Sequence, residues 1–359
     1  MSLRSRDFTA AESLYRQAAE AEEAALRELD QGKRRTLGIT AVSAAALYYK
    51  ARAFGEAENL AYQWLPHPSL PEFAAGKLRG LLQMSWAARA EEKHDIRFAP
   101  TDVVVSVRGR EVVYGGAPLD LIVHKVSEVE KLFFRVTEFL LGREHRVRGE
   151  VLRDVKEMAR LWLFQVAPGS YQFMVRVQEP PQRSLLEDES RPDATKVSQT
   201  FLAVVRASIQ DPEGALTRLV SRPEYRRTFL QMTRNLAPTR RTAFDRIDIR
   251  EAAEPPASAI SLAPEARTQL NAALRAERPS EGAAEPSVLR GTLRAIHLDQ
   301  KWLSVTDPQE PTKHTKIFRT SDAIDDIIGP MVNHAVIVET ELDGRGQHVF
   351  RDIELDEDA

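Results

Sequence analysis

The chain has 359 residues, too many for one ordinary hydrophobic core, so we expect about two to four domains. Its 43% hydrophobic and 29% charged residues are typical of a soluble globular protein. It has no cysteine, which excludes disulfides, thiolate metal ligands and a cysteine nucleophile. No apolar run approaches the roughly 20 residues of a membrane span, and the first residues lack a signal-peptide core. The sequence therefore predicts a cytoplasmic bacterial protein with no membrane partner.

Charge is distributed unevenly along the chain. The net charge is −3, but residues 218–250 hold nine arginines and three acids, whereas residues 287–359 hold eight basic and fourteen acidic residues. Opposite fields of this size can attract different partners or each other. The simpler interpretation is that the arginines only solvate the helices that carry them.

The first part of the chain, residues 1–95, predicts a helical domain. Thr9 with Glu12 forms a possible capping box, and the segment up to Leu29 is rich in strong helix formers. Gly32 and a cluster of prolines separate the expected helices. These helices are expected over 9–29, 35–52, 54–65 and 71–93.

Residues 44–65 resemble a tetratricopeptide-type helical hairpin. The small, aromatic, aromatic and small positions of that family and its terminal proline correspond to Ala45, Tyr48, Phe54, Ala57 and Pro68. Arg52 replaces the usual turn glycine, and a stable array normally needs about three repeats, so we expect one hairpin with a flanking helix. The resemblance implies a protein-binding module whose candidate contacts are Tyr48, Tyr49, Tyr62 and Trp64. The alternative is that small residues merely let two helices approach closely.

Residues 100–277 predict a middle α+β domain. Its centre is a helix over 118–142, in which apolar residues recur every three or four positions for about six turns. Gly142 lies where a helix stop is expected, and charged residues such as Lys125 and Arg135 fill most of the other side. The other expected elements are a hairpin over 102–114, strands over 170–177 and 244–250, and helices over 148–163, 196–209, 212–220, 223–236 and 262–276.

The last segment, residues 287–359, predicts a small β-rich domain after a linker. Three strands, one helix and two strands match the element order of an OB-fold barrel, and a small SH3-like barrel is equally possible. These elements are expected at 289–297, 302–306 and a strand ending at 318, then the helix 320–328 and the strands 332–340 and 348–355. The whole chain is thus predicted to be a multidomain α+β protein.

No stretch predicts a catalytic centre. The sequence lacks a phosphate-binding loop, a dinucleotide fingerprint, a nucleophile elbow and any zinc-type spacing of histidines. His145, which lies between arginines, is expected on the surface, and Asp154 with Lys156 matches the end of a nuclease motif by chance. The N-terminus of the helix expected at Thr320 is favoured by three acids, Asp322, Asp325 and Asp326. We therefore expect no catalytic residue, no cofactor and no metal.

Two groups of side chains could bind a nucleic acid or another acidic partner. The first lies on or between the second and third strands of the predicted barrel and comprises Lys301, Trp302, Lys313, His314, Lys316 and Phe318. The balance of −6 over 287–359 opposes this interpretation, because phosphate contacts dominate affinity. The second group follows one stretch of sequence and comprises Arg226, Arg227, Arg234, Arg240 and Arg241. These arginines could instead form internal ion pairs, including pairs with the acidic C-terminal segment.

Two segments, residues 224–238 and 325–333, are similar to segments of uncharacterised bacterial proteins, and this resemblance implies no function. The sequence favours a non-enzymatic adaptor or regulatory protein that binds a protein partner through its helical and barrel modules. The alternative is a nucleic-acid-binding accessory protein, for example of an antiphage or stress system.

Overall fold

The computed structural model describes residues 8–94, 98–113, 116–165, 171–179, 192–239, 241–277, 287–310, 312–320 and 324–356. The chain divides into two compact units. One consists of Met1–Arg97 with Phe164–Phe173, and the other of Phe98–Leu163 with Met174–Ala359. The three-part division into 1–95, 100–277 and 287–359 therefore separates two segments that the structure places in one unit.

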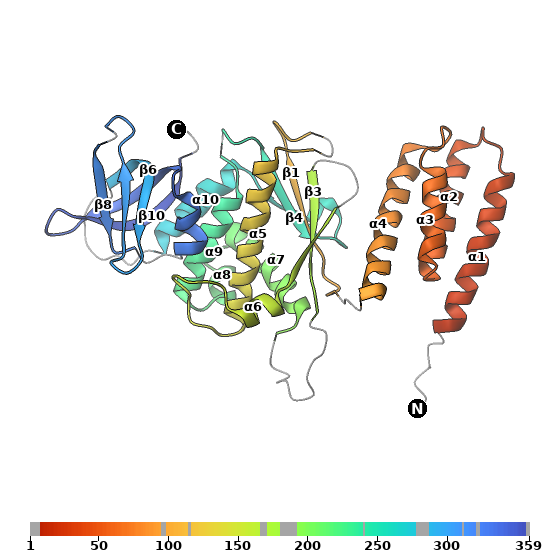
Figure 1. Cartoon of the computed structure of the whole chain (residues 1–359), viewed down its shortest axis with the longest axis horizontal. Coiled ribbons are helices and arrows are strands. Elements are labelled where there is room, and N and C mark those ends of the chain that lie inside the picture. Colours follow the sequence, from red (N-terminus) through yellow and green to blue (C-terminus); the bar gives the residue numbers. More distant parts are fainter. Residues whose placement is uncertain are drawn as a thin grey trace, which may run out of the picture. The chain divides into compact units, whose positions relative to one another are not determined.

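The first unit contains four helices that lie side by side (Figure 1). They are α1 (Phe8–Glu28), α2 (Arg34–Lys50), α3 (Phe54–Trp64) and α4 (Glu72–His94). Helix α2 contacts each of the other three helices, and alanines provide much of the buried surface between them. The mixed fold with an N-terminal helical region is confirmed, whereas membership of the tetratricopeptide family stays a prediction.

The close approach of α2 and α4 depends on a glycine. A Cβ atom at Gly38 would lie 2.6 Å from Cγ of Pro71, which is far inside van der Waals contact. Ala41 of α2 and Ala74 of α4 are also fully buried. Small side chains on facing helices therefore fix the spacing between the beginnings of α2 and α4.

The middle segment forms a five-stranded sheet with the order β2-β3-β1-β4-β5, and most of its residues belong to the second unit. Its central pair is antiparallel, with Val103 opposite Glu251 and Arg108 opposite Arg246. Valine, which packs well in strands, dominates β1, and this strand is buried along most of its length. The strands are β1 (Val103–Arg108), β2 (Leu161–Gln165), β3 (Tyr171–Val177), β4 (Arg246–Glu251) and β5 (Ile260–Leu262).

The hairpin predicted over 102–114 is wrong. After β1 the described residues make two isolated bridges, between Gly109 and Val112 and between Val113 and Gly116, and no second strand. Arg110 donates hydrogen bonds to Asp245 Oδ1 at 2.7 Å and to the carbonyl of Thr242 at 2.6 Å. These contacts direct the chain toward the segment before β4, and the distant strand β4 takes the place expected for the second hairpin strand.

Three helices of this unit contact α5, as its long apolar pattern predicts. Helix α5 contacts both α7 and α9, and the Phe133 and Phe201 rings stack with centroids 4.1 Å apart. The helix predicted over 148–163 is only six residues long, because the chain turns into strand β2 after it. The helices are α5 (Leu119–Leu140), α6 (Arg153–Met158), α7 (Ala194–Gln210), α8 (Ala215–Leu219), α9 (Pro223–Leu236) and α10 (Pro264–Ala276), with the 3₁₀ turn η1 (Pro256–Ser258).

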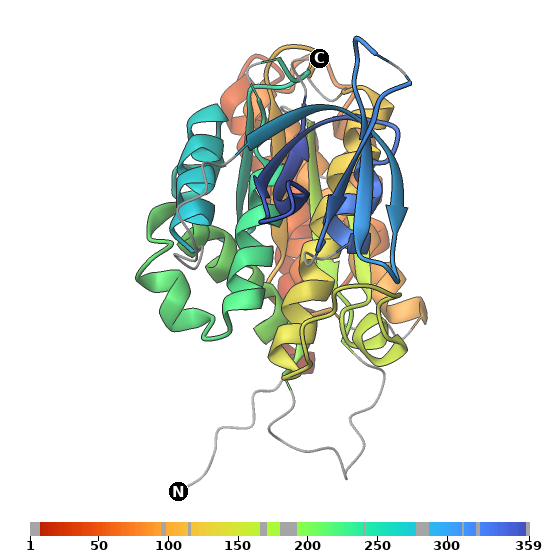
Figure 2. The same ribbon diagram turned by 90° about the vertical axis from the view of Figure 1, so that its left-hand side faces the viewer.

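The C-terminal sheet has five strands, which curve strongly (Figure 2). Strand β6 pairs with β7 and β9, and β10 pairs with β9 and, over two residues in parallel, with β8. The predicted helix over 320–328 is described only from residue 324 and is a single π-helical turn followed by a 3₁₀ turn. The elements are β6 (Ser287–His297), β7 (Trp302–Thr306), β8 (His314–Phe318), η2 (Ile324–Ile328), η3 (Gly329–Met331), β9 (Ala335–Leu342) and β10 (His348–Leu355).

Candidate functional site

The arginines of α9 are engaged inside the second unit. Arg234 is 1% exposed and forms an ion pair with Asp352 of β10, and it also donates to the carbonyl of Ile353 at 2.6 Å. Gln231 donates to the same Asp352 carboxylate at 3.0 Å. Burial is the largest single effect and would raise the pKa of Asp352. The charge and hydrogen bond of Arg234, the charge of Arg227 and the hydrogen bond from Gln231 together outweigh it and hold this pKa below its usual value. Arg234 is therefore not available to a phosphate backbone.

The other arginines of this group are mostly engaged as well. Arg226 pairs with Glu277 at 2.9 Å and donates to the carbonyls of Val220 and Ser221. Arg227 donates to the carbonyl of Arg351 on β10. Arg241 is exposed, and its backbone N–H group donates to Thr239 Oγ1 at 3.3 Å. Arg240 lies outside the described residues. These contacts favour the internal alternative, in which α9 holds the acidic C-terminal segment.

Many acids of the C-terminal segment face basic side chains of residues 100–277. Asp326 pairs with Arg135 and, at 3.0 Å, with Arg146, and neither Arg135 nor Asp326 has more than 7% of its side chain exposed. Further pairs of this kind are Arg148–Asp299 at 2.8 Å, Arg267–Glu354 at 2.9 Å and Arg275–Glu339 at 3.1 Å. The negative charge of the C-terminal segment is thus largely neutralised within the unit. The net charge of −6 is therefore no guide to the charge on the remaining C-terminal surface.

A basic groove opens on the C-terminal sheet. Its cavity has a volume of about 1050 Å³. It lies between the turn before β7, the end of β8 and the turn between β9 and β10. The cations that line it are Lys301, Arg319 and Arg345. The acid in its lining, Asp343, accepts hydrogen bonds from the backbone N–H groups of Gln347 and Arg345, which lower the pKa of Asp343. Three cations therefore line one groove, and the carboxylate in its lining, that of Asp343, is hydrogen-bonded to backbone N–H groups of the turn that carries it.

The backbone at this groove is unusual. Lys301 and Arg319 have φ angles of 51° and 61°, in the left-handed region that non-glycine residues rarely adopt. The N–H group of Thr320 donates to the Lys301 carbonyl at 3.1 Å and joins the two segments. The Thr320 side chain is fully buried, and its Oγ1 atom has no hydrogen-bond partner among the described residues. Such strained and unsatisfied groups are typical of ligand-binding positions.

The barrel residues predicted from sequence are only partly brought together. Lys301 and Phe318 line the groove with Arg319 and Arg345, which the sequence prediction missed. Because Trp302 pairs with Phe318 across β7 and β8, it lies near the same end. Lys316 Nζ lies 4.7 Å from the centre of the Trp302 ring, an attractive cation–π distance. Lys313 and His314 lie at the opposite end of β8. The glycines of Asp343-Gly-Arg-Gly-Gln347 were a sequence signal for a turn that carries Arg345 at this position.

The four aromatic residues predicted to contact a protein differ in exposure. Tyr48 is buried and donates to Glu23 at 2.6 Å, and burial and the nearby Glu23 raise its pKa. Tyr49 and Trp64 are half-buried. Tyr62 is 54% exposed, and its ring centroid lies 6.4 Å from that of Trp86, which is 46% exposed. Of the predicted residues, Tyr62 is thus the one whose ring is open to a partner.

His145 is not the surface residue that the sequence suggests. Its Nε2 atom lies 2.7 Å from Thr228 Oγ1. Its ring is nearly perpendicular to that of Tyr225, with the ring centroids 5.2 Å apart. Burial, aided by the nearby Arg135 charge, lowers the pKa of His145 to about 4. The ring is therefore neutral at pH 7 and acts as a packed, hydrogen-bonded part of the contact with α9.

Comparisons with known proteins give no relative. No family model matches the chain, and no match was found among the curated proteins or the solved structures. Within the described ranges, no group of three or more metal-ligating side chains converges. None of the helices in the described part of the chain is long and apolar enough to cross a membrane.

Proposed function

We propose that the chain is a non-enzymatic adaptor that binds other macromolecules through separate surfaces on its two compact units. The observation that carries this proposal is the contrast between buried and exposed ionic groups. Buried side chains such as Arg234, Asp352 and Arg135 are paired with one another in the second unit. Exposed cations instead line an open groove. The buried charges therefore stabilise the fold, whereas the exposed cations of the groove are placed to bind a partner.

The C-terminal module of this adaptor is an OB-like barrel. The supporting observations are the strand pairings, in which β6 joins β7 to β9 and a short parallel contact joins β8 to β10. Three strands, a short helical segment and two strands also follow one another in the expected order. This strand order favours the OB-like over the SH3-like alternative.

The protein-binding part of the proposal belongs to the exposed Tyr62–Trp86 pair of the first unit. Aromatic rings supply much of the binding energy of protein interfaces. The test is affinity capture by the full chain from nuclease-treated bacterial lysate, repeated with a Tyr62→Ser/Trp86→Ser variant. A Leu14→Ser variant is the control, because Leu14 is another exposed apolar residue of the same unit.

We expect the same protein to be retained by the wild-type chain and the control and to be lost from the double variant. Once purified, this partner should bind the purified wild-type chain and the Leu14→Ser control with similar affinity and the double variant much more weakly. Retention of no specific protein, or equal retention by all three chains, would contradict this part of the proposal.

Single-stranded nucleic acid is the second candidate partner, and the basic groove favours it. Lys301, Arg319 and Arg345 can contact phosphates, while Phe318 and Trp302 offer rings near the same end of β8. The earlier objection, the balance of −6, loses its force because many of those acids are paired inside the unit.

The nucleic-acid candidate is tested by fluorescence anisotropy with a labelled single-stranded oligonucleotide at two salt concentrations. Each charge reversal Lys301→Glu, Arg319→Glu or Arg345→Glu should weaken binding about tenfold, and higher salt should weaken binding by the wild-type chain. Arg153→Glu is the control, because the Arg153 side chain is 92% exposed and does not line the groove. Absence of binding at low salt, or equal losses in all variants, would remove this candidate.

A further inference from the structure

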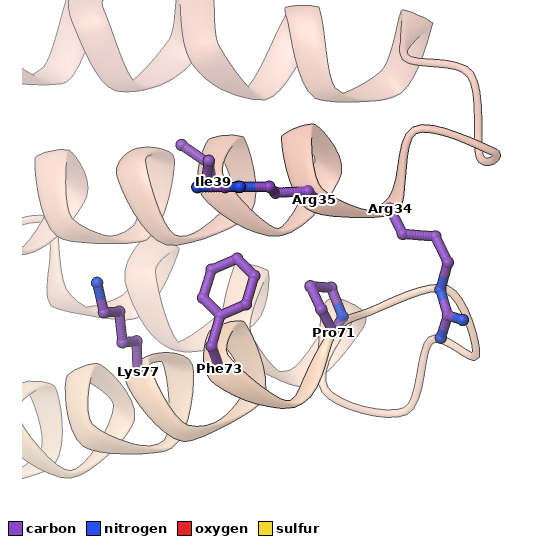
Figure 3. Close-up of a pocket in the computed structure, with 6 residues that line it drawn as sticks. All are labelled: Arg34, Arg35, Ile39, Pro71, Phe73 and Lys77. Atoms are coloured by element: carbon purple, nitrogen blue, oxygen red, sulfur yellow. The ribbon is translucent and has the colours of Figure 1, made fainter.

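A second groove lies on the first unit, between the beginnings of α2 and α4 (Figure 3). Its volume is about 780 Å³, and it is lined by Arg34, Arg35, Ile39, Pro71, Phe73 and Lys77. Arg35 and Ile39 are four residues apart on α2, and Phe73 and Lys77 are four residues apart on α4. Each helix therefore presents one cation and one apolar side chain, one turn apart, to the same groove.

The apolar side chains of this groove are open to solvent. Ile39 is 51% exposed and Phe73 is 46% exposed. In Figure 3 the Phe73 ring extends from α4 toward α2, on the side where Ile39 lies. Two large apolar side chains held in water on facing helices gain free energy when a third apolar side chain is placed between them.

The cations of the groove have no counter-charge among the described residues. Arg35 and Lys77 are exposed and form no ion pair with any side chain in the described residues, and no acidic side chain lines the groove. Arg34 donates to the carbonyls of Pro68 at 3.2 Å and Ser69 at 3.4 Å, which hold its guanidinium against the loop before α4. The positive charge at this position is thus left for an external anion.

The groove is also preformed. Gly38 and Pro71 hold α2 and α4 at a fixed separation, because any larger side chain at position 38 would collide with the proline ring. A partner would therefore bind without first ordering these helices, which removes one entropic cost of association.

We propose that this groove binds a segment of a partner protein in which an apolar side chain lies between acidic residues. The apolar side chain would pack between Ile39 and Phe73, and the carboxylates would meet Arg35 on one helix and Lys77 on the other. A bare polyanion would satisfy the cations but leave the apolar pair in water. The inference goes beyond the proposed function, because this groove shares no residue with the Tyr62–Trp86 pair or with the basic groove of the C-terminal sheet.

The test uses the full chain and a short fluorescein-labelled peptide in which a phenylalanine lies between glutamate pairs. Binding is followed by fluorescence anisotropy. The variant Arg35→Glu/Lys77→Glu should weaken binding by at least about tenfold, and Ile39→Ala/Phe73→Ala should weaken it by about threefold or more. The control is Arg79→Glu, because Arg79 is exposed on α4 and does not line the groove. Circular dichroism melting of each variant shows that its helices remain folded.

Saturable peptide binding that is lost in both groove variants and kept in the Arg79→Glu control supports the inference. Three results would overturn it. The first is no saturable binding of the peptide, and the second is equal binding of a peptide with lysines in place of the glutamates. The third is that the groove variants weaken binding of a single-stranded oligonucleotide but not of the peptide.

Discussion

Arg234 and Asp352 belong to segments with opposite charge, and the structure buries both side chains against each other. Removing two charges from water costs several kcal/mol, so such a pair persists only where further hydrogen bonds support it. Here Asn271, Gln231 and the Ile353 carbonyl provide them. At this scale the arginine-rich helix is a structural clamp on strand β10.

Truncation of this clamp should be costly. We expect Arg234→Ala to lower the free energy of unfolding by about 3–5 kcal/mol, because the Asp352 carboxylate is left buried without its counter-charge. The apolar double variant Arg234→Met/Asp352→Leu should recover much of this loss. Urea denaturation measures both effects, with Arg153→Ala as an exposed control whose change stays within about 0.5 kcal/mol. A loss for Arg234→Ala no larger than that of the control would show that the pair is not structural.

His145 gives the second prediction at the scale of single residues. Its pKa is about 4 in the folded chain and about 6.5 in an unfolded one, so the unfolded state binds more protons between these values. The contribution of this ring to stability is therefore complete above pH 6.5 and is lost as the pH falls toward 4.

The expected loss is on the order of 1–2 kcal/mol, less than the full shift implies because solvent screens a partly exposed ring. Urea denaturation between pH 7 and pH 4 measures it, and a His145→Gln variant should lack this part of the pH dependence. Identical pH profiles for the two chains would contradict the assignment.

Individual elements were predictable where local signals agree. The periodic pattern and Gly142 predicted α5 to within two residues at each end, and Pro223 predicted the start of α9. The same periodicity misplaced some side chains on α5. Leu119 and Val123 are exposed, whereas Lys125 and Arg135 are buried, because their partners come from α9 and from the C-terminal segment.

Helix α5 should therefore tolerate change unevenly along its apolar pattern. We expect Phe133→Ala to destabilise the second unit by about 3–5 kcal/mol, because it removes a buried ring stacked on Phe201 and leaves a cavity. Val123→Ala, at a position 59% exposed, should change stability by less than about 0.5 kcal/mol. Thermal or urea unfolding of the two variants compares them directly, and equal effects would refute the packing described for α5.

Pairing between distant segments was not readable from local sequence. The valine-rich stretch before Gly109 was correctly predicted as a strand, but its partner, β4, lies more than a hundred residues away. The helix expected over 148–163 was predicted too long for a similar reason. Trp162 belongs to strand β2, and its indole N–H donates to Oε1 of Gln178, just after strand β3. Turn residues and hydrophobic periodicity indicate the local backbone conformation. Which strands pair, and in which register, depends on how the apolar faces of the whole unit are buried.

The sequence predicted the types of residue in the candidate site, basic and aromatic, but not the full set of residues that line it. Lys301 and Phe318 were identified because basic and aromatic residues gather on or between the expected second and third strands, whereas Arg319 and Arg345 lie at a strand end and in a turn. The groove of the helical unit was missed, because Arg35, Ile39, Phe73 and Lys77 come from two helices and form no motif along the sequence. The internal contacts of the arginines in α9 became visible only through their partners, which are Glu277 for Arg226 and residues of β10 for Arg227 and Arg234.

At the scale of the whole molecule, the two compact units carry different binding surfaces. The first presents exposed aromatic and apolar side chains and, in the groove between α2 and α4, cations that form no ion pair with the described residues. The second presents the basic groove of its C-terminal sheet. Within the second unit, opposite charges of the middle and C-terminal segments neutralise one another. We therefore propose that the two units bind their partners through separate surfaces. These are the Tyr62–Trp86 pair and the groove between α2 and α4 in the first unit, and the basic groove in the second.

Hydrogen–deuterium exchange of the full chain tests this central claim most directly, measured alone, with the acidic peptide, with the oligonucleotide and with both. The account predicts that the peptide slows exchange in residues 35–39 and 71–77, and that the oligonucleotide slows exchange in residues 300–301, 318–320 and 343–347. Both regions should be protected at once when both ligands are present. Protection of the same residues by the two ligands, or protection confined to the helices and strands between α5 and α10, would contradict it.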